Sequence, residues 1–132
     1  MTLLVPNTGE DLALKNFLNY EAPQSQTLKL FQSNTTPAET DTAGTYTECT
    51  LTGYSAAGLT GASWGFTPGA PSAAAYAEQT FTFTAGFGQV IYGYYVVQAT
   101  SGTLMWAERD ASPFTPANSG DQVKITPALT AD

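Results

Sequence analysis

Carboxylates are the side chains in this sequence whose types and spacing could support catalysis. Glu108 and Asp110 lie two residues apart, so in a strand both would lie on the same face. A glycosidase places two carboxyl groups roughly 5 to 10 Å apart on either side of a cleft. The simpler interpretation is that this pair solvates the end of a hairpin strand, with Arg109 on the opposite face. The sequence has no histidine, which excludes Ser-His-Asp and Cys-His nucleophile systems, so we predict no catalytic residue.

Metal-binding chemistry has few candidates. Cys49 is the single cysteine, which leaves no cysteine cluster for zinc and no partner for an intrachain disulfide. Glu39 and Asp41 in a loop, or Asp121, could supply oxygen ligands to calcium, but the spacing of an EF-hand is absent. We therefore predict no metal and no cofactor, with a loop-bound calcium ion as the open alternative.

The charge of the chain argues against a nucleic-acid partner. The formal net charge is −7, and the four cations lie far apart in sequence, at Lys15, Lys29, Arg109 and Lys124. Neutralising backbone phosphates requires clustered cations, so we expect no nucleic acid to bind. No stretch approaches the roughly 20 apolar residues of a membrane-spanning helix, and the first residues do not resemble a signal peptide. The sequence thus predicts no membrane partner and synthesis in a cytoplasm.

The composition predicts one β-rich domain. A chain of 132 residues suits a single domain, and 42% of the residues are hydrophobic, which is enough for a core. Threonine, which favours strands, occurs 21 times, whereas charged residues make up only 11% of the chain. Uncharged, threonine-rich strands suit a protein that packs beside copies of itself, because little charge must be desolvated. They also suit secreted binding modules.

The pattern predicts one helix, over residues 9–19. Thr8 is the expected N-cap, and Leu14, Phe17 and Leu18 recur at i, i+3 and i+4 as a single apolar stripe. The helix should end before Pro23, because the residue before a proline is disfavoured in helical conformation.

Residues 1–8 are predicted to form an N-terminal arm in front of a single domain of residues 9–132. Leu3, Leu4 and Val5 are adjacent apolar residues, and Pro6 separates them from the helix. Either the domain's own sheet or a neighbouring subunit could bury them. We favour the neighbouring subunit, which makes these three residues interface candidates.

Segments that alternate with period two predict the strands. The clearest is 79–84, in which Phe81 and Phe83 face one side and threonines the other. The segment 46–54 would place Cys49 and Leu51 on one face. The other predicted strands span 27–31, 89–98, 103–108 and 122–126, and the predicted loops span 33–45, 53–72 and 110–120. This count and spacing predict a mainly β fold: a single antiparallel β-sandwich or barrel-like domain with one short N-terminal helix.

Two aromatic residues lie inside the glycine-rich stretch 53–72. Trp64 and Phe66, with Tyr54 and Tyr76 nearby in sequence, could form a platform on which sugars stack. The alternative is that they cover the core beneath a glycine-rich loop, which we favour for Trp64 because tryptophan is usually largely buried. Both remain candidates for an interface.

Four stretches in a fixed order together carry a resemblance that none carries alone. They are residues 5–10 (VPNTGE), 28–37 (LKLFQSNTTP), 46–48 (YTE) leading to 53–54 (GY), and 91–97 (IYGYYVV) followed by 104–109 (LMWAER). Together they resemble small virion proteins of tailed bacteriophages, some of which are capsid decoration or cement proteins. The resemblance covers most of the chain and transfers no catalytic residue.

This resemblance implies a non-enzymatic virion structural protein that is made in the host cytoplasm. Its expected partners are the major capsid protein and copies of itself, as a homo-oligomer. The alternative is a receptor- or carbohydrate-binding module of a tail or fibre, for which Trp64 and Phe66 are the candidates. A small carboxylate hydrolase is a third class, against which the missing histidine argues.

Overall fold

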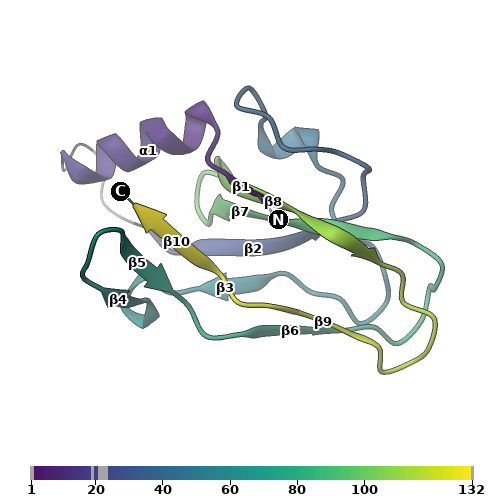
Figure 1. Cartoon of the computed structure of the whole chain (residues 1–132). Helices are drawn as coiled ribbons and strands as arrows, with labels where there is room; N and C mark the ends of the chain where they lie inside the picture. Colours follow the sequence, from purple (N-terminus) through teal and green to yellow (C-terminus); the bar gives the residue numbers. More distant parts are fainter. Residues whose placement is uncertain (1, 19, 21–23, 132) are drawn as a thin grey trace.

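The computed structural model describes residues 2–18, 20 and 24–131, and it confirms a mainly β fold with antiparallel sheets. One α-helix of 11 residues, α1 (Asn7–Phe17), lies at the upper left in Figure 1. The strands are β1 (Thr2–Leu4), β2 (Gln26–Phe31), β3 (Ala57–Leu59), β4 (Gly65–Thr67), β5 (Ser72–Ala75), β6 (Gln79–Thr82), β7 (Ile91–Gln98), β8 (Leu104–Phe114), β9 (Gln122–Ile125) and β10 (Ala128–Ala131). Two short 3-10 turns, η1 (Ala43–Thr45) and η2 (Gly61–Ser63), complete the secondary structure of the described residues.

The strands form three sheets. The largest has the order β1-β8-β7-β2-β3, and it is accompanied by a three-stranded sheet, β10-β5-β4, and a two-stranded sheet, β6-β9. In Figure 1 the large sheet crosses the middle of the molecule, the β6–β9 pair runs along the bottom, and β4 and β5 lie at the lower left. The arrangement is sandwich-like, as the sequence predicted.

Strand β7 is the centre of the molecule because it is buried on both faces. One face contributes Tyr94 and Val96 to the main core, which also contains Phe81 and Phe83, both buried as predicted. The other face contributes Tyr95 and Val97 to a smaller cluster, which Tyr46 and Phe31 complete. An apolar strand with no polar face is what a doubly covered central strand requires.

The helix begins earlier than predicted, and it docks on the sheet through the face opposite its apolar stripe. It begins after Pro6, and the hydroxyl of Thr8, the expected cap, donates instead to the carbonyl oxygen of Leu104 over 3.0 Å. A Cβ atom at Gly9 would collide with the carbonyl of Met105, so this glycine lets the helix lie directly against the backbone of β8. Leu12 is buried on that side.

The apolar stripe of the helix points to solvent. Leu14, Phe17 and Leu18 are 60%, 86% and 70% exposed. The i, i+3, i+4 pattern correctly groups these residues on one face. The face that docks on the sheet is the opposite one, and it carries Gly9 and Leu12.

The N-terminal segment is part of the domain, which corrects the division into an arm of residues 1–8 and a domain of residues 9–132. Residues 2–4 form β1, which pairs antiparallel with β8, Leu3 opposite Glu108 and Leu4 opposite Ala107. Leu3 packs against the main core. Residues 2–4 therefore belong to the domain's own sheet, and Leu3 packs within the domain; Met1 lies outside the described residues.

Regions predicted as loops contain short strands, and one predicted strand is irregular. The glycine-rich stretch 53–72 holds β3, β4 and the start of β5, and β10 follows directly after Pro127. In the stretch 46–54, Cys49 and Leu51 are buried as predicted, but only single bridges form, at Glu48 and Thr52. No helix in the described part of the chain is long and apolar enough to cross a membrane.

Candidate functional site

The paired carboxylates of β8 line a small hollow. Glu108, Asp110, Tyr94 and Lys124 border a cavity of about 120 Å³. The buried hydroxyl of Tyr94 donates to Oε2 of Glu108 over 2.5 Å, and burial followed by this carboxylate raises the pKa of the phenol. Cavities that hold small organic ligands are usually about 300 to 1,000 Å³. The geometry therefore gives Glu108 a structural partner, and the hollow beside it is smaller than the usual ligand cavity.

Two of the carboxylates considered for calcium, Asp41 and Asp121, accept hydrogen bonds from the backbone of their own loops. Oδ2 of Asp41 accepts hydrogen bonds from the backbone N–H of Ala38 and from the hydroxyl of Tyr46, at 2.9 and 2.8 Å. Oδ2 of Asp121 accepts from two backbone N–H groups, which lower the pKa of that carboxyl. Within residues 2–18, 20 and 24–131, no three acidic, cysteine or histidine side chains gather as metal ligands.

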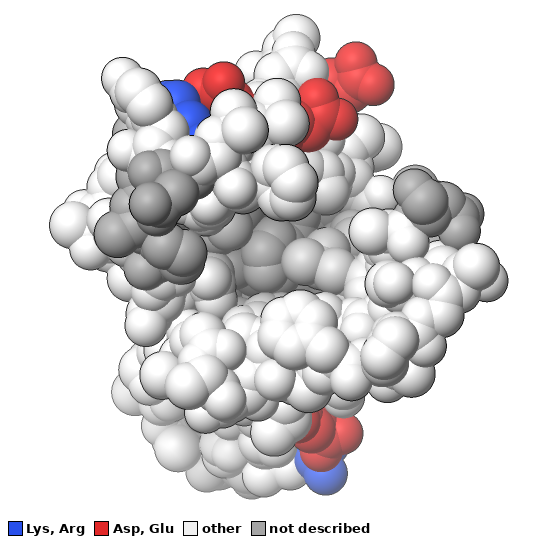
Figure 2. Space-filling view, turned by 90° about the vertical axis from the view of Figure 1, so that its left-hand side faces the viewer, with Lys and Arg blue, Asp and Glu red and all other residues white. Residues whose placement is uncertain are grey.

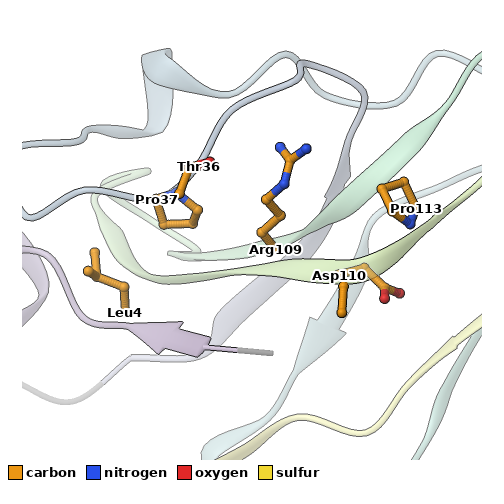
Figure 3. Close-up of a pocket in the computed structure, with 7 residues that line it drawn as sticks. Leu4, Thr36, Pro37, Arg109, Asp110 and Pro113 are labelled. Atoms are coloured by element: carbon orange, nitrogen blue, oxygen red, sulfur yellow. The ribbon is translucent and has the colours of Figure 1, made fainter.

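Arg109 holds the loop that contains Asn34 and Thr35 against β8. Figure 3 shows its guanidinium pointing toward that loop, while Asp110 points away on the other side of the strand. The guanidinium donates to the carbonyl oxygen of Thr35 and to Oδ1 of Asn34, at 2.8 and 2.7 Å, and lies 4.9 Å from the ring centre of Tyr92. The hollow of about 500 Å³ beside it is open, and apart from Arg109 and Asp110 its lining is small or apolar.

The three interface candidates of the N-terminal segment are only partly available. Leu3 packs on the core, Leu4 lines the hollow beside Arg109, and Val5 is 37% exposed. Only Val5 therefore offers an exposed side chain to another molecule.

Trp64 and Phe66 have different surroundings. Trp64 is half-buried, its Nε1 donates to Oε1 of Gln26 over 3.1 Å, and its ring packs edge-on against Tyr76 and Trp106. Phe66, two residues further on in β4, is 76% exposed. Trp64 thus belongs to the core, as the sequence favoured, whereas Phe66 is available for contact.

Phe66 belongs to a surface without charge. The sheet β10-β5-β4, which we call the uncharged sheet, contains no Asp, Glu, Lys or Arg in any of its strands. The sequence from residue 49 to residue 77 is also free of charged residues. Figure 2 looks at this end of the molecule and shows charged side chains above and below, with an uncharged and partly hollowed surface between them.

Helix α1 lies at the same end of the molecule, above the uncharged sheet in Figure 1. Asp11, Leu14, Lys15, Leu18 and Tyr20 line a shallow hollow of about 550 Å³. Asp11 and Lys15 pair with each other at 3.1 Å. The sequence pattern predicts the apolar stripe but assigns it no function. The signal that could have shown its direction is Gly9, a small residue that marks the opposite face as the one that docks on the sheet.

Comparisons of the chain with protein-family models, with curated protein sequences and with solved structures found no match.

Proposed function

We propose that this chain is a non-enzymatic structural protein of a tailed-bacteriophage virion, which binds the outer shell of the capsid as a decoration or cement protein. Its partners are the major capsid protein and copies of itself, as a homo-oligomer. The observation that carries the proposal is the uncharged sheet, from which Phe66 projects with 76% of its surface exposed.

Burying an uncharged surface against another protein costs little desolvation free energy. Removing a charged side chain from water costs several kcal/mol unless a partner compensates for it. The centres of protein interfaces are accordingly poor in charge and rich in aromatic residues. The strands of the uncharged sheet carry no charge and present one exposed aromatic ring, that of Phe66.

The uncharged sheet is also held rigidly, which lowers the entropy lost on binding. Trp64 ties the start of β4 to β2 through Gln26. Tyr76, directly after β5, donates its backbone N–H to the carbonyl of Pro127 and accepts from the N–H of Thr60 at its hydroxyl. The resemblance of the sequence to phage virion proteins supports a shell as the partner of this surface.

Addition of the protein to empty capsids that lack it tests the proposal. Phe66→Glu puts a charge on β4, an edge strand of the uncharged sheet, so we expect at least a tenfold loss of binding in co-sedimentation with the capsids. Phe87→Glu is the matched control, because Phe87 is 40% exposed and lies outside the uncharged sheet. Unchanged binding by Phe66→Glu, at an unchanged melting temperature, would refute this docking surface.

The exposed ring of Phe66 also favours a second candidate, a carbohydrate- or receptor-binding module of a tail or fibre. Sugars stack on exposed aromatic rings. Glycan binding that Phe66→Ala abolishes, in a protein that does not add to empty capsids, would support this candidate over decoration of the shell.

A further inference from the structure

We propose that the outer face of α1, formed by Asp11, Leu14, Lys15, Phe17 and Leu18, is a contact between two copies of this chain. In this contact two α1 helices pack antiparallel about a two-fold axis. The proposal deepens the homo-oligomeric part of the proposed function by naming the surface that joins the copies, and it can be tested without any capsid.

The first argument is that nothing in the described chain covers this face. The helix docks on β8 through Gly9, Leu12 and the hydroxyl of Thr8, which fixes its orientation. The opposite side of the helix therefore faces solvent. On this side, Leu14 is 60% exposed and Phe17 is 86% exposed. Contiguous apolar surface of this kind is uncommon on monomeric proteins and marks interaction sites.

The second argument is the distribution of charge along the helix. Acidic Asp11 lies in the N-terminal half and basic Lys15 in the C-terminal half, and both line the hollow beside Leu18. An antiparallel partner brings its Lys15 toward Asp11 and its Asp11 toward Lys15. A parallel partner would bring like charges together, so charge selects the antiparallel arrangement, which a two-fold axis perpendicular to the helices produces.

The third argument is the area available. Leu14, Phe17 and Leu18 are all at least 60% exposed, and so is Tyr20, which follows the helix, lines the same hollow and would join the contact. At roughly 150–250 Å² for a large aromatic side chain, their exposed parts amount to on the order of 500 Å² per copy. Two copies would bury about 1,000 Å², the lower limit for a specific interface. This area predicts a weak dimer, with a Kd between about 1 µM and about 1 mM.

A weak contact is sufficient for a protein displayed in many copies. Once a surface holds neighbouring copies close together, each pairwise contact forms at a high effective concentration. The same contact stays largely open in dilute solution, so the free protein would remain monomeric until it is concentrated on its support.

Sedimentation velocity over a protein concentration range of about 1 µM to about 1 mM measures the pairing. We expect the wild type to shift from monomer to dimer, and Leu14→Gln/Leu18→Gln to remain monomeric with an unchanged melting temperature, because both sites are exposed and glutamine favours helices. Phe87→Gln is the control: Phe87 is an exposed apolar residue that lies outside the helix, so this variant should still dimerise.

A charge exchange tests the antiparallel geometry. Asp11→Lys replaces the carboxylate that would face Lys15 of the other copy with a cation, and we expect about tenfold weaker pairing from two symmetric contacts. Asp11→Lys/Lys15→Asp restores opposite charges across the axis and should restore pairing. Leu14→Cys, close to the axis, should form a symmetric disulfide, whereas Ser119→Cys in an exposed loop should not; Cys49 is buried.

A wild type that stays monomeric at about 1 mM would overturn the proposal. So would a dimer that survives Leu14→Gln/Leu18→Gln. Dimerisation without binding to empty capsids would refute the shell-binding function but not the helix contact. Capsid binding by a protein that stays monomeric would refute the helix contact but not the shell-binding function.

Discussion

The indole N–H of Trp64 donates to Oε1 of Gln26 across 3.1 Å, and this bond joins the segment entering β4 to β2 of the five-stranded sheet. Edge-on packing of the same ring against Trp106, at 6.1 Å between ring centres, adds a second attachment to the core. Two residues later the chain carries Phe66 into solvent. The core thus holds the segment from which the proposed docking residue projects.

Replacing Trp64 should destabilise the domain, whereas replacing Phe66 should not. Trp64→Ala removes a half-buried ring and leaves Gln26 without its donor, for an expected loss of about 2 to 4 kcal/mol in the free energy of unfolding. Phe66→Ala, at an exposed site, should change it by less than about 0.5 kcal/mol. Urea denaturation measures both. The opposite ranking would mean that the two aromatic residues have been assigned to the wrong environments.

Phe83 should be one of the most sensitive core positions. Its side chain is fully buried in the main core, so Phe83→Ala should cost about 3 to 5 kcal/mol. Thr80→Ala, on the exposed face of β6, is the control and should stay within about 0.5 kcal/mol of wild type. Chemical denaturation of the two variants provides the comparison, and a loss below about 1 kcal/mol for Phe83→Ala would contradict its place in the core.

Deletion of residues 1–5 should destabilise the isolated domain. It removes β1 from the edge of the large sheet and takes Leu3 from the core, a loss of about 1.5 to 3 kcal/mol for one apolar side chain at full burial. Leu3→Ala is the milder comparison and should show part of the same loss. A truncated domain that melts as the wild type does would contradict the pairing of β1 with β8.

Alkaline pH should unfold the domain through its buried tyrosines. Burial, and then the carboxylate that each hydroxyl meets, raises the pKa of Tyr46 and Tyr94, and burial also raises that of Tyr54. Burial followed by the charge of Glu48 raises the pKa of Tyr95 to about 12. Unfolded phenols titrate near pH 10, so this contribution to stability is complete below about pH 10 and is lost as the pH rises toward the folded values.

Phenolate absorbance and circular dichroism, followed together during an alkaline titration, check this expectation. We expect the absorbance of these four tyrosines to rise only when the circular dichroism signal of the fold is lost. Tyr46→Phe keeps the ring but removes the hydroxyl that meets Asp41, and it should remove one late-titrating group. Complete titration of all seven tyrosines before any loss of structure would contradict the burial of these phenols.

Local sequence patterns predicted the parts of the fold that local chemistry determines. Alternation in 79–84 correctly placed Phe81 and Phe83 in the core. The short strands β4, β5 and β10 escaped prediction because their glycine, alanine and serine residues have weak strand preference, and distant pairing creates these strands. The pairing of β1 with β8 spans most of the chain and leaves no local signal.

The candidate surfaces were only partly predictable. Period two would place Trp64 and Phe66 on the same face of a strand, yet one packs inward and the other is exposed. The reason is that Trp64 precedes β4, at the end of η2, and so is not part of the strand's alternation. Likewise, the apolar stripe of the helix identifies one face but does not show whether that face points to the sheet or to solvent. That orientation depends on the close contact of Gly9 with β8.

The most direct test of the shell-binding role is a difference map between capsids with and without the bound protein. The account predicts added density on the outer surface of the capsid, into which the domain fits with the uncharged sheet and Phe66 against the major capsid protein. Density confined to a tail or fibre, or a bound domain whose uncharged sheet faces solvent, would contradict it.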